Sequence, residues 1–410
     1  MKKTVISPAN IMLPPYDPKN DLWPSYAVIA CDQFTSEPEY WEQVRERVGN
    51  SLSTLNYILP EAYLGTELEK KQGSAVAENM KTASQKLREH ENCLIYIERV
   101  LPDGRIRPGI IGKLDLEEYD FSPDSKSAVR ATEETVVSRI PPRVAVRKAA
   151  EIELPHVMVF ADDTEKALIR PLSERKDEME LLYDFQLMQG GGSIKGYKLS
   201  GEILIDVASA IERYECSRKN GLVYAMGDGN HSLASAKAHY ENVKKELGDK
   251  AKECNARYAL VEIVDLNDSS IEFEPIYRLL VNCDANDILE YIASRANDVE
   301  TVGGVTVIYA GCEKEICVPK LHELTMGSLQ MLIDDYLAEN KGVVCDYIHG
   351  EDTLKKLAVR EKSVGFLCKG VEKEELFAYV EKNGTLPRKT FSMGEAASKR
   401  YYIEARKIIE

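Results

Sequence analysis

The chain has 410 residues, with 53 Lys and Arg against 68 Asp and Glu, so its formal net charge is −15 at pH 7. A composition of 44% hydrophobic and 30% charged residues is typical of a folded globular protein and excludes collagen-like and low-complexity classes. The acidic balance argues against general nucleic-acid binding, which needs a positive surface, but allows a local basic pocket for a small anion. No apolar run approaches the roughly 20 residues that a membrane span requires.

The N-terminal sequence and the cysteines indicate a cytoplasmic protein. The first residues, MKKTVISPANIMLPPYDP, hold two lysines and no long apolar stretch, so we expect no signal peptide. The nine cysteines are an odd number and are expected to be reduced and unpaired. Cys312 and Cys317 lie close together but lack CxxC spacing, so we expect no zinc site.

The first part of the chain reads as strands and helices in alternation. It predicts a buried strand over 26–31, a helix that Ser36 caps ahead of Pro38, mostly helical chain over 61–91, and strands 93–100 and 105–114 joined at Pro102-Asp103-Gly104. A loop-rich stretch over 122–147 follows, and then strands over 155–161 and 183–188 with helix-like patterns over 164–172 and 202–213.

The remaining chain continues this alternation. A strand over 221–226 precedes a helix over 232–247 and a strand over 257–264, and the last third predicts strands over 305–310, 343–348 and 363–368 with helices over 328–339 and 372–382. The prediction is therefore a mixed α/β fold with a mixed sheet. We expect three regions: 1–195 with the hairpin and an arginine-bearing loop, 196–290 with a glycine turn, and 291–410 with further α/β chain.

The sharpest local motif is Gly227-Asp228-Gly229-Asn230-His231-Ser232, between a predicted strand and a predicted helix. Two glycines allow a tight turn and close approach of a ligand, and the helix start offers free N–H groups to a phosphate or carboxylate. Asp228 and His231 add proton-transfer or metal-binding groups. The alternative is a plain strand–turn–helix connection with Asn230 as the helix cap, since the spacing matches neither the Walker nor the Rossmann pattern.

Three further segments carry cations that are compatible with an anion site. Gln189 to Tyr197 contains three consecutive glycines and Lys195, although a hairpin loop explains this composition equally well. Arg130 and Arg139 lie in the loop-rich stretch, where guanidinium groups could reach an anion or form ordinary surface ion pairs. Arg388 and Lys389 form a weaker signal near the C-terminus.

The evidence for covalent catalysis is thinner. The chain has no Gly-x-Ser-x-Gly elbow, and Cys31, which follows an apolar run, is more typical of an inert buried cysteine than of a nucleophile. Tyr16-Asp17 after Pro14-Pro15 could face a cleft, although turn chemistry explains that dipeptide as well.

Several of these motifs together resemble one bacterial family, domain of unknown function 1015. The resemblance rests on five segments in the same order along the chain: Pro14-Pro15-Tyr16-Asp17, Gly227 to His231, Glu274-Pro275-Ile276-Tyr277-Arg278, Ile348-His349-Gly350 and Leu386 to Phe391. The family's central motif usually reads Asp-Gly-His-His-Arg ahead of a helix. Here Asn230 stands where a His is usual and Ser232 where the Arg is usual, so the cationic side chain of the motif is missing.

That central motif is similar to the one in the ParB/sulfiredoxin-like superfamily, in which a glycine turn at a helix start meets nucleotide phosphates. The resemblance implies a nucleotide- or phosphate-binding protein, with phosphotransferase or nucleotide hydrolase activity on a small metabolite and Mg²⁺ as the accompanying ion. Asp228 would act as base or Mg²⁺ ligand, and His231 as the other catalytic residue. Phosphate binding would fall to the backbone and side chains of Gly227, Gly229, Asn230 and Ser232, with Arg130, Arg139 or Lys195 replacing the missing cation. The alternative is a non-catalytic ligand-sensing or scaffold protein with a degenerate nucleotide pocket.

Overall fold

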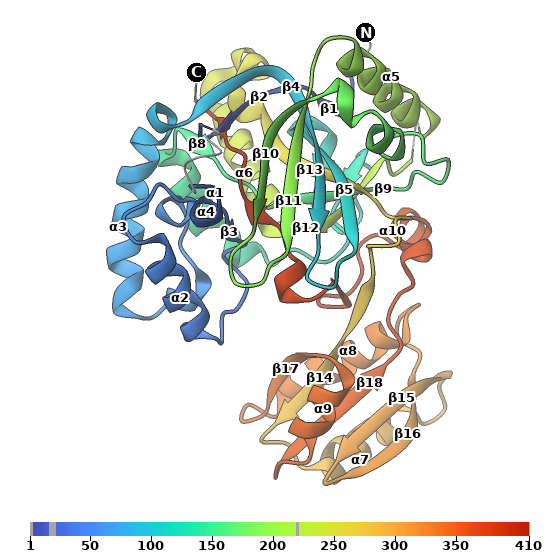
Figure 1. Ribbon diagram of the computed structural model, residues 1–410. Helices are drawn as coiled ribbons and strands as arrows, with labels where there is room; N and C mark the ends of the chain where they lie inside the picture. The colour runs from blue at the N-terminus through green and yellow to red at the C-terminus, as the bar shows by residue number, and fades with distance from the viewer. Residues whose placement is uncertain (1–2, 16–21, 219–220, 410) are drawn as a thin grey trace. The chain divides into compact units, whose positions relative to one another are not determined.

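The computed structural model describes residues 3–15, 22–218 and 221–409, which fall into two compact units (Figure 1). Unit 1 comprises residues 1–271 and 395–410, and unit 2 comprises residues 272–394. The segment after unit 2 therefore returns to unit 1. This division differs from the three expected regions, because the boundary expected at 195 falls inside a strand that pairs with residues 94–100. Tyr16 and Asp17 lie outside the described residues.

Unit 1 is built on a mixed sheet to which eleven strands contribute in the described residues. Its main path is β10 (Glu180–Gln186), β11 (Ser193–Leu199), β4 (Arg88–Val100), β5 (Ile106–Asp115), β13 (Tyr258–Asp265), β9 (Met158–Ala161), β12 (Tyr224–Asp228), β7 (Val129–Arg130) and β6 (Tyr119–Asp120), with β1 (Ile6–Ser7) beside β5 and β2 (Ala9–Leu13) beside β4. The pairs β13·β9, β12·β7 and β6·β7 are parallel and the other pairs are antiparallel. The predicted mixed α/β fold is confirmed.

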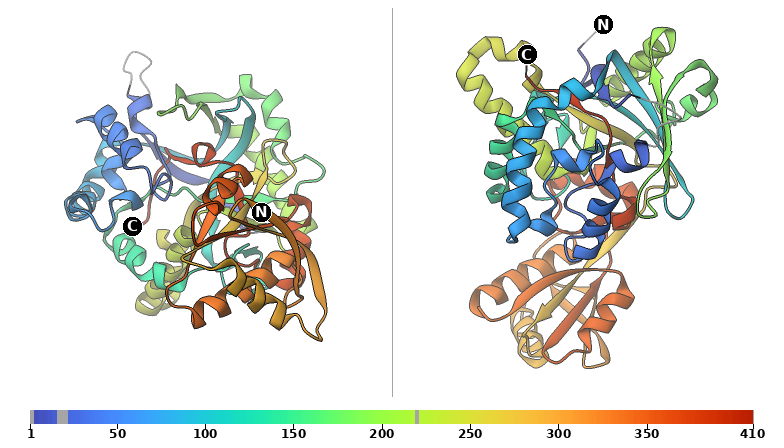
Figure 2. Two further views of the ribbon diagram at one scale, coloured as in Figure 1. Left: turned by 90° about the horizontal axis from the view of Figure 1, so that it is seen from below. Right: turned by 60° about the vertical axis from the view of Figure 1, so that its left-hand side comes forward.

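Each face of this sheet packs against a different set of helices (Figure 2). On one face, α1 (Trp23–Tyr26), α2 (Pro38–Val48) and α3 (Glu67–Thr82) cover Ile95 and Ile97 of β4. On the other face, α5 (Gly201–Ser217) and α6 (Asn230–Leu247) cover Leu94 and Tyr96 of the same strand. Successive residues of β4 therefore enter opposite cores, as the two-residue period of a strand requires.

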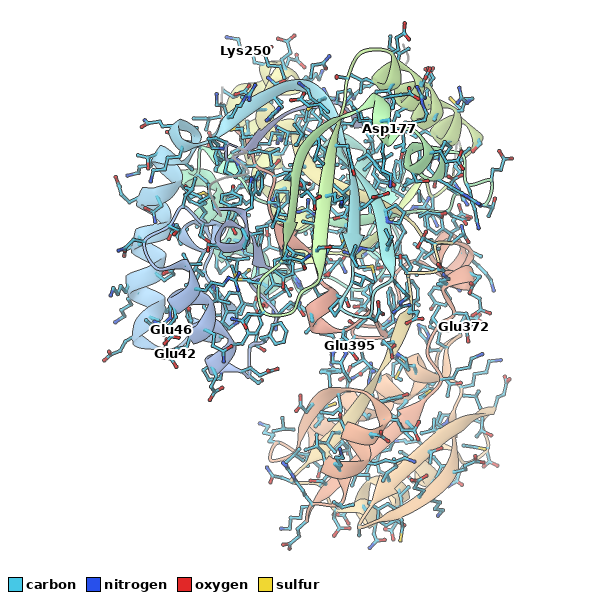
Figure 3. All side chains as sticks on the ribbon, in the orientation of Figure 1. Glu42, Glu46, Asp177, Lys250, Glu372 and Glu395 are labelled. Atoms are coloured by element: carbon cyan, nitrogen blue, oxygen red, sulfur yellow. The ribbon has the colours of Figure 1, made fainter. Side chains whose placement is uncertain are left out.

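Helix α2 illustrates how sequence pattern sets packing in unit 1. Trp41, Val44 and Val48 are buried at three- and four-residue spacing, while Glu42 and Glu46 project from the exposed side (Figure 3). The predicted helix start is right to within two residues, but Glu37, not Ser36, precedes the first turn, and its side chain makes no capping hydrogen bond.

Two of the secondary-structure expectations for unit 1 are wrong. The stretch over 122–147 contains α4 (Ile140–Ala149), because Pro141 and Pro142 stand in the first turn, where the missing N–H groups cost nothing. Residues 164–172 form no α-helix; a 3₁₀ turn begins at Arg170 instead.

Two short two-stranded ladders complete unit 1. One pairs β3 (Val28–Ile29) with β20 (Tyr401–Tyr402), and the other pairs β8 (Ile152–Glu153) with β21 (Arg406–Lys407).

Unit 2 has its own sheet and core. The sheet order is β16 (Cys312–Pro319), β15 (Thr301–Tyr309), β18 (Ser363–Cys368), β14 (Phe273–Val281) and β17 (Val344–His349), and β19 (Phe391–Met393) pairs with the start of β14. Its helices are α7 (Ala285–Arg295), α8 (Thr325–Glu339), α9 (Glu351–Ala358) and α10 (Leu376–Asn383). Helices α7 and α8 contribute to one apolar cluster with β15 and β18, whereas α9 packs on Leu279, Ile308 and Ile348.

Candidate functional site

The predicted glycine turn joins β12 to α6, and a β-bulge sets its geometry. Met226 opposes Val159 of β9 and Asp228 opposes Met158, so Gly227 is the extra residue on β12. Gly229 follows with φ +80°, and a Cβ there would lie 3.0 Å from the Cα of Val157. Only glycine fits this position without strain. Asn230 is the first helical residue of α6 and Gly229 is its N-cap, so the expectation that Asn230 caps the helix is wrong.

The bulge turns the Asp228 carboxylate toward a buried lysine from the C-terminal segment. Asp228 Oδ1 accepts a hydrogen bond from the N–H of Gly229 at 2.8 Å, and Oδ2 lies 3.4 Å from Nζ of Lys399. The Lys399 side chain is only 9% exposed and that of Asp228 17%. A buried ammonium is costly without a counter-charge, and Asp228 supplies that counter-charge to Lys399 at the turn.

The loop after β7 lies against the same turn. Thr132 Oγ1 donates to the carbonyl of Met226 at 2.9 Å, and the N–H of Val136 donates to Nε2 of His231 at 3.3 Å. Within the described residues, two buried oxygens of these segments have no hydrogen-bond partner, Thr135 Oγ1 and Asn230 Oδ1. Because buried polar atoms are usually satisfied in native proteins, these two oxygens are polar groups of the turn that a ligand or water would have to satisfy.

A third segment approaches the turn through His156. Val157, the next residue, is the one that a Cβ at Gly229 would strike. His156 Nδ1 lies 2.8 Å from the hydroxyl of Tyr402, and its ring packs edge-on against the Tyr402 ring. The same hydroxyl contacts the N–H of Cys31 at 3.3 Å and its Sγ at 3.2 Å.

Asp32, the residue after Cys31, belongs to the same group. The N–H of Ala30 donates to the carbonyl of Arg400, which continues the β3·β20 ladder toward Lys399. Burial by itself raises the pKa of Asp32, but the charges of His156 and Lys399 and the amide of Gln33 outweigh it and lower that pKa. Asp32 is therefore an ionised carboxylate near Lys399, to which Asp228 is also paired.

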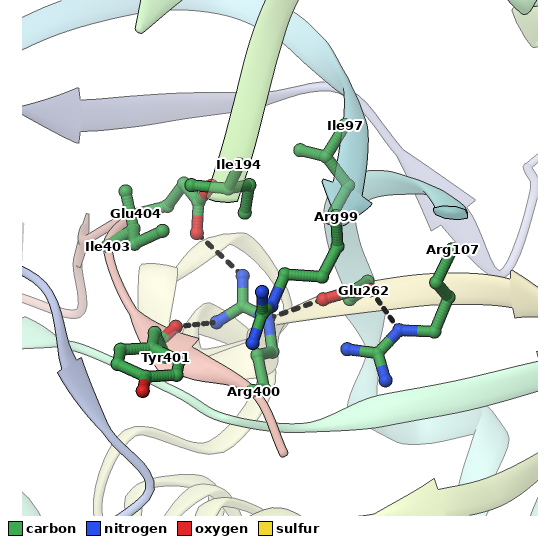
Figure 4. A pocket seen from close by; sticks show the side chains of 9 residues that line it. All are labelled: Ile97, Arg99, Arg107, Ile194, Glu262, Arg400, Tyr401, Ile403 and Glu404. Carbon is green, nitrogen blue, oxygen red and sulfur yellow. Dashed lines mark hydrogen bonds and ion pairs between the residues drawn. The ribbon is translucent and has the colours of Figure 1, made fainter. Parts of the chain in front are cut away.

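A buried layer of charge underlies this group (Figure 4). Arg400 donates from Nε to Glu262 Oε2 at 2.8 Å, from Nη1 to the carbonyl of Pro155 at 2.6 Å and from Nη2 to Glu404 Oε2 at 2.6 Å. Arg400 thus ties the sheet, through Glu262, to the backbone next to His156. The layer also includes Arg99 and Arg107, and burial lowers the pKa of Arg107 even though Glu262 counteracts it.

This charged layer encloses a space of about 10 Å³, the size of about one water molecule. Among the described residues, Arg99 Nε, Arg107 Nε and Glu262 Oε1 have no hydrogen-bond partner, and the last two lie 3.8 Å apart. The space is too small for a metabolite, so it is not a ligand pocket.

The structure brings together some of the predicted site residues and separates others. Gly227, Asp228, Gly229, Asn230, His231 and Ser232 form the turn, and Arg130 pairs with Ala225 on the neighbouring strand, where its Nε donates to the carbonyl of Ser127. Arg139 is exposed, three residues beyond Val136. Lys195 lies on β11, five strands from β12 or about 24 Å away, and its ammonium is 2.9 Å from Asp184. The structure does not bring Lys195 to the turn.

Three residues of the site were missed by sequence reasoning, namely Asp32, His156 and Lys399. Lys399 precedes Arg400-Tyr401-Tyr402, and two cations followed by two aromatic residues were the one local signal available. His156 and Asp32 carry no motif. Their proximity depends on Tyr402 lying between His156 and Cys31, residues that are far apart in the sequence.

The donor set bears on the expected Mg²⁺ ion. In the described part of the chain, no three His, Cys, Asp or Glu side chains converge as metal ligands. Asp228 and Asp32 offer carboxylates, which fits an ion held by one or two protein oxygens together with phosphate oxygens and water, as Mg²⁺ usually is.

All nine cysteines are free thiols, and burial raises the pKa of Cys31 to about 12. No helix of the described chain has the length and apolar character needed to cross a bilayer.

Comparison with solved structures yields distant similarities. A conserved hypothetical protein from Pyrococcus furiosus matches with a TM-score of 0.37 and 12% identity over 72% of this chain and 94% of its own. A free serine kinase variant in complex with AMP matches with a TM-score of 0.39 and 13% identity over 72% and 90%. SbnI from Staphylococcus aureus matches with a TM-score of 0.37 and 11% identity over 71% and 85%.

The comparison with protein families gives a match, whereas the comparison with individual curated proteins gives none. No curated protein matches the chain. The family model described as "Protein of unknown function (DUF1015)" matches residues 15–407, which covers both units and the returning C-terminal segment. The resemblance seen in the motifs is thereby confirmed, and the chain belongs to the DUF1015 family.

Proposed function

We propose that the β12–α6 turn binds the phosphate groups of a nucleotide, and that the protein is a phosphotransferase or nucleotide hydrolase acting on a small metabolite. The observation that carries this proposal is the buried ammonium of Lys399 against Asp228 at the start of an 18-residue helix. Helix α6 directs its first N–H groups and the positive end of its dipole at the same place. Lys399 thus supplies the cation that the motif lacks at Ser232.

The turn also supports close approach of an anion. Gly229 keeps the backbone free of a side chain, and the Thr135 hydroxyl, whose oxygen has no partner among the described residues, is able to donate to an anion. His231 is engaged through Nε2 with the N–H of Val136, so its ring orders the loop over the turn. We therefore assign His231 a positioning role beside any direct contact with phosphate.

Mg²⁺ would be bound together with the nucleotide, with Asp228 and Asp32 as the protein ligands on offer. When bound, the ion neutralises charge on the phosphate oxygens. Lys399 holds the Asp228 carboxylate in place before ligand binding, and the α6 N–H groups orient the phosphate. A bound phosphate would interact with the same Lys399 ammonium that pairs with Asp228. Ligand affinity therefore depends on the buried ion pair.

Thermal-shift and calorimetric titrations with ATP, ADP and AMP, each with and without Mg²⁺, test the proposal. A nucleotide at 100 times its dissociation constant should stabilise the protein by about 2.7 kcal/mol. Lys399→Met should weaken binding by roughly 10- to 100-fold, because a charge-assisted hydrogen bond contributes about 1.5–3 kcal/mol. Lys407→Met is the matched control, since Lys407 is exposed and paired with Glu89, and it should bind as wild type does.

Gly229→Val and His231→Ala sharpen the same test. The valine should block the ligand and lower stability, because it places a β-branched side chain at a positive φ against Val157. His231→Ala should weaken binding with a smaller shift in melting temperature. If the wild-type protein binds none of the three nucleotides, the proposal is wrong.

The second candidate is a ligand-sensing or scaffold protein with a degenerate pocket. Ser232 in place of an arginine favours it. Nucleotide binding without phosphate release, or without transfer to any added metabolite, would select this candidate. A thermal shift with an amino acid or another metabolite in place of nucleotides would do so as well.

A further inference from the structure

Arg99 of β4 and Arg107 of β5 lie directly opposite each other in the sheet of unit 1. Both side chains are buried, with an exposed fraction of only 2% for each residue. Like charges at directly opposite positions of an antiparallel pair destabilise a sheet. Burial lowers the pKa of Arg99, and the charge of Arg107 lowers it further. Two buried cations in this register need a polar group between them.

Glu262 of β13 supplies part of what the two arginines need. Gly109 lies two residues after Arg107, on the same face of β5, and a Cβ at Gly109 would lie 3.1 Å from Glu262 Oε1. The Glu262 carboxylate therefore lies over the glycine. Even so, Arg107 Nε and Glu262 Oε1 are 3.8 Å apart, which is too far for a hydrogen bond. A water molecule commonly bridges two polar groups at such a separation.

Arg99, Arg107 and Glu262 all line the 10 Å³ space of the charged layer (Figure 4). Each carries one polar atom that has no hydrogen-bond partner among the described residues, namely Arg99 Nε, Arg107 Nε and Glu262 Oε1. Two of these atoms are N–H donors and one is an acceptor. None of the nine residues that line the space is more than 5% exposed. The space is thus a buried site with a defined set of hydrogen-bonding groups.

The donor and acceptor set selects the occupant. A metal cation would face two guanidinium groups, and a halide would face a carboxylate oxygen to which it has no proton to give. A water molecule can accept from both arginines and donate to the carboxylate, and it matches the size of the space. We propose that one water molecule is bound here as a fixed part of the protein, with hydrogen bonds to Arg99 Nε, Arg107 Nε and Glu262 Oε1. Three hydrogen bonds are usual for a buried water.

The water completes a contact that holds the returning C-terminal segment. Arg99 Nη2 donates to the carbonyl of Ala397 at 3.3 Å, and Arg107 Nη1 donates to the carbonyl of Ser398 at 3.0 Å. These two residues immediately precede Lys399. The water fixes the Nε edges of the two guanidinium groups, while their Nη atoms fasten the segment to β4 and β5. Nucleotide plays no part in this contact, so the tests use the protein without nucleotide.

A crystal structure of the wild-type chain, determined with and without a bromide soak, tests the site directly. One water-sized density peak should lie at roughly 2.7–3.2 Å from each of the three atoms, with no anomalous signal from bromide. An anomalous peak in the space would identify an anion site. A direct hydrogen bond between Arg107 Nε and Glu262 Oε1, with no peak, would show that the space closes. Either result overturns the proposal.

Two solution measurements test the water and its role separately. Relaxation dispersion of ¹⁷O water counts the molecules that stay bound for longer than the protein takes to tumble, and Arg107→Met should have one fewer than wild type. Hydrogen exchange of the peptide over 395–402 should become roughly 10-fold faster in the same variant, because its hydrogen bond to Ser398 is lost. Arg105→Met is the matched control: Arg105 lies on the same strand–turn–strand unit, pairs with Asp103 at the surface, and should leave both values unchanged.

The outcomes distinguish the two parts of the inference. An unchanged water count in a folded Arg107→Met variant overturns the bound water. Unchanged exchange over 395–402 overturns its role in fastening the segment. If Arg107→Met does not fold, the wild-type density still decides whether the water is present.

Discussion

The two units each bury arginine side chains, but they satisfy them differently. In unit 2, every guanidinium nitrogen of Arg278 donates: Nε to Gln330 Oε1 at 2.8 Å, Nη1 to the carbonyls of Ile276 and Lys389, and Nη2 to the carbonyl of Arg388 at 3.0 Å. In unit 1, Arg99 Nε and Arg107 Nε have no hydrogen-bond partner among the described residues. The acceptors of Arg278 are therefore uncharged, whereas buried arginines of unit 1 form ion pairs with buried carboxylates.

This difference separates a structural device from a candidate site. Arg278 uses its donors on backbone carbonyls and holds the Leu386–Phe391 motif against β14, which explains that motif by folding alone. In unit 1, the charged layer leaves polar atoms unsatisfied and continues into the Lys399–Asp228 pair. Incomplete satisfaction of buried charge is typical of functional sites, because a ligand or water completes it.

Removing Arg278 should have the largest effect on stability. Arg278→Met keeps the length of the side chain but leaves buried acceptors of Gln330, Arg388 and Lys389 without their donor, so we expect a loss of roughly 3–5 kcal/mol from unit 2. Both tryptophans, Trp23 and Trp41, belong to unit 1. Urea unfolding should therefore shift in circular dichroism while tryptophan fluorescence changes less.

Arg295→Met is the control for this variant, because Arg295 forms an exposed pair with Glu339 and should contribute less than about 1 kcal/mol. Equal losses for the two arginines would show that the buried hydrogen bonds of Arg278 do not stabilise unit 2, and the contrast between the units would fail.

Asp265 of unit 1 should give a smaller, pH-dependent effect. Burial and the nearby charge of Asp163 raise its pKa from 3.8 to about 6, so the folded state holds this proton more tightly than the unfolded chain does. The stabilisation is present below about pH 4 and is lost as pH rises through 6. Asp265→Asn should therefore stabilise the protein by roughly 1–3 kcal/mol at pH 8 and change it little at pH 4. Denaturant midpoints at both pH values measure this, and a difference independent of pH would contradict it.

Lys195 should give the smallest effect. Its pair with Asp184 is about two-fifths exposed, and such pairs contribute about 0–1 kcal/mol. Lys195→Met should leave both stability and nucleotide affinity close to wild type, measured beside Lys399→Met. A loss of affinity as large as that of Lys399→Met would restore Lys195 to the site and remove the reason for assigning the cation to Lys399.

Local sequence predicted the elements around the turn well because short-range physics decides them. An apolar run ahead of Gly227 and an amphipathic pattern after Ser232 predicted β12 and α6 to within three residues. The same reasoning failed where local signals are ambiguous: the prolines that begin α4 suggested a loop, and β11 begins at Ser193, inside a segment read as a hairpin loop.

The sequence by itself determined the family, the mixed α/β class and the strand–glycine turn–helix unit, since each depends on neighbouring residues. Only the tertiary structure placed Lys399 beside Asp228, 171 positions away, and His156 beside Tyr402. Those contacts depend on the bulge at Gly227 and on the pairing of β3 with β20 after unit 2 has been traversed. Strand register is set by the packing of the whole sheet face, and a shift of one residue would reverse every side chain, so no local pattern encodes which distant charges meet.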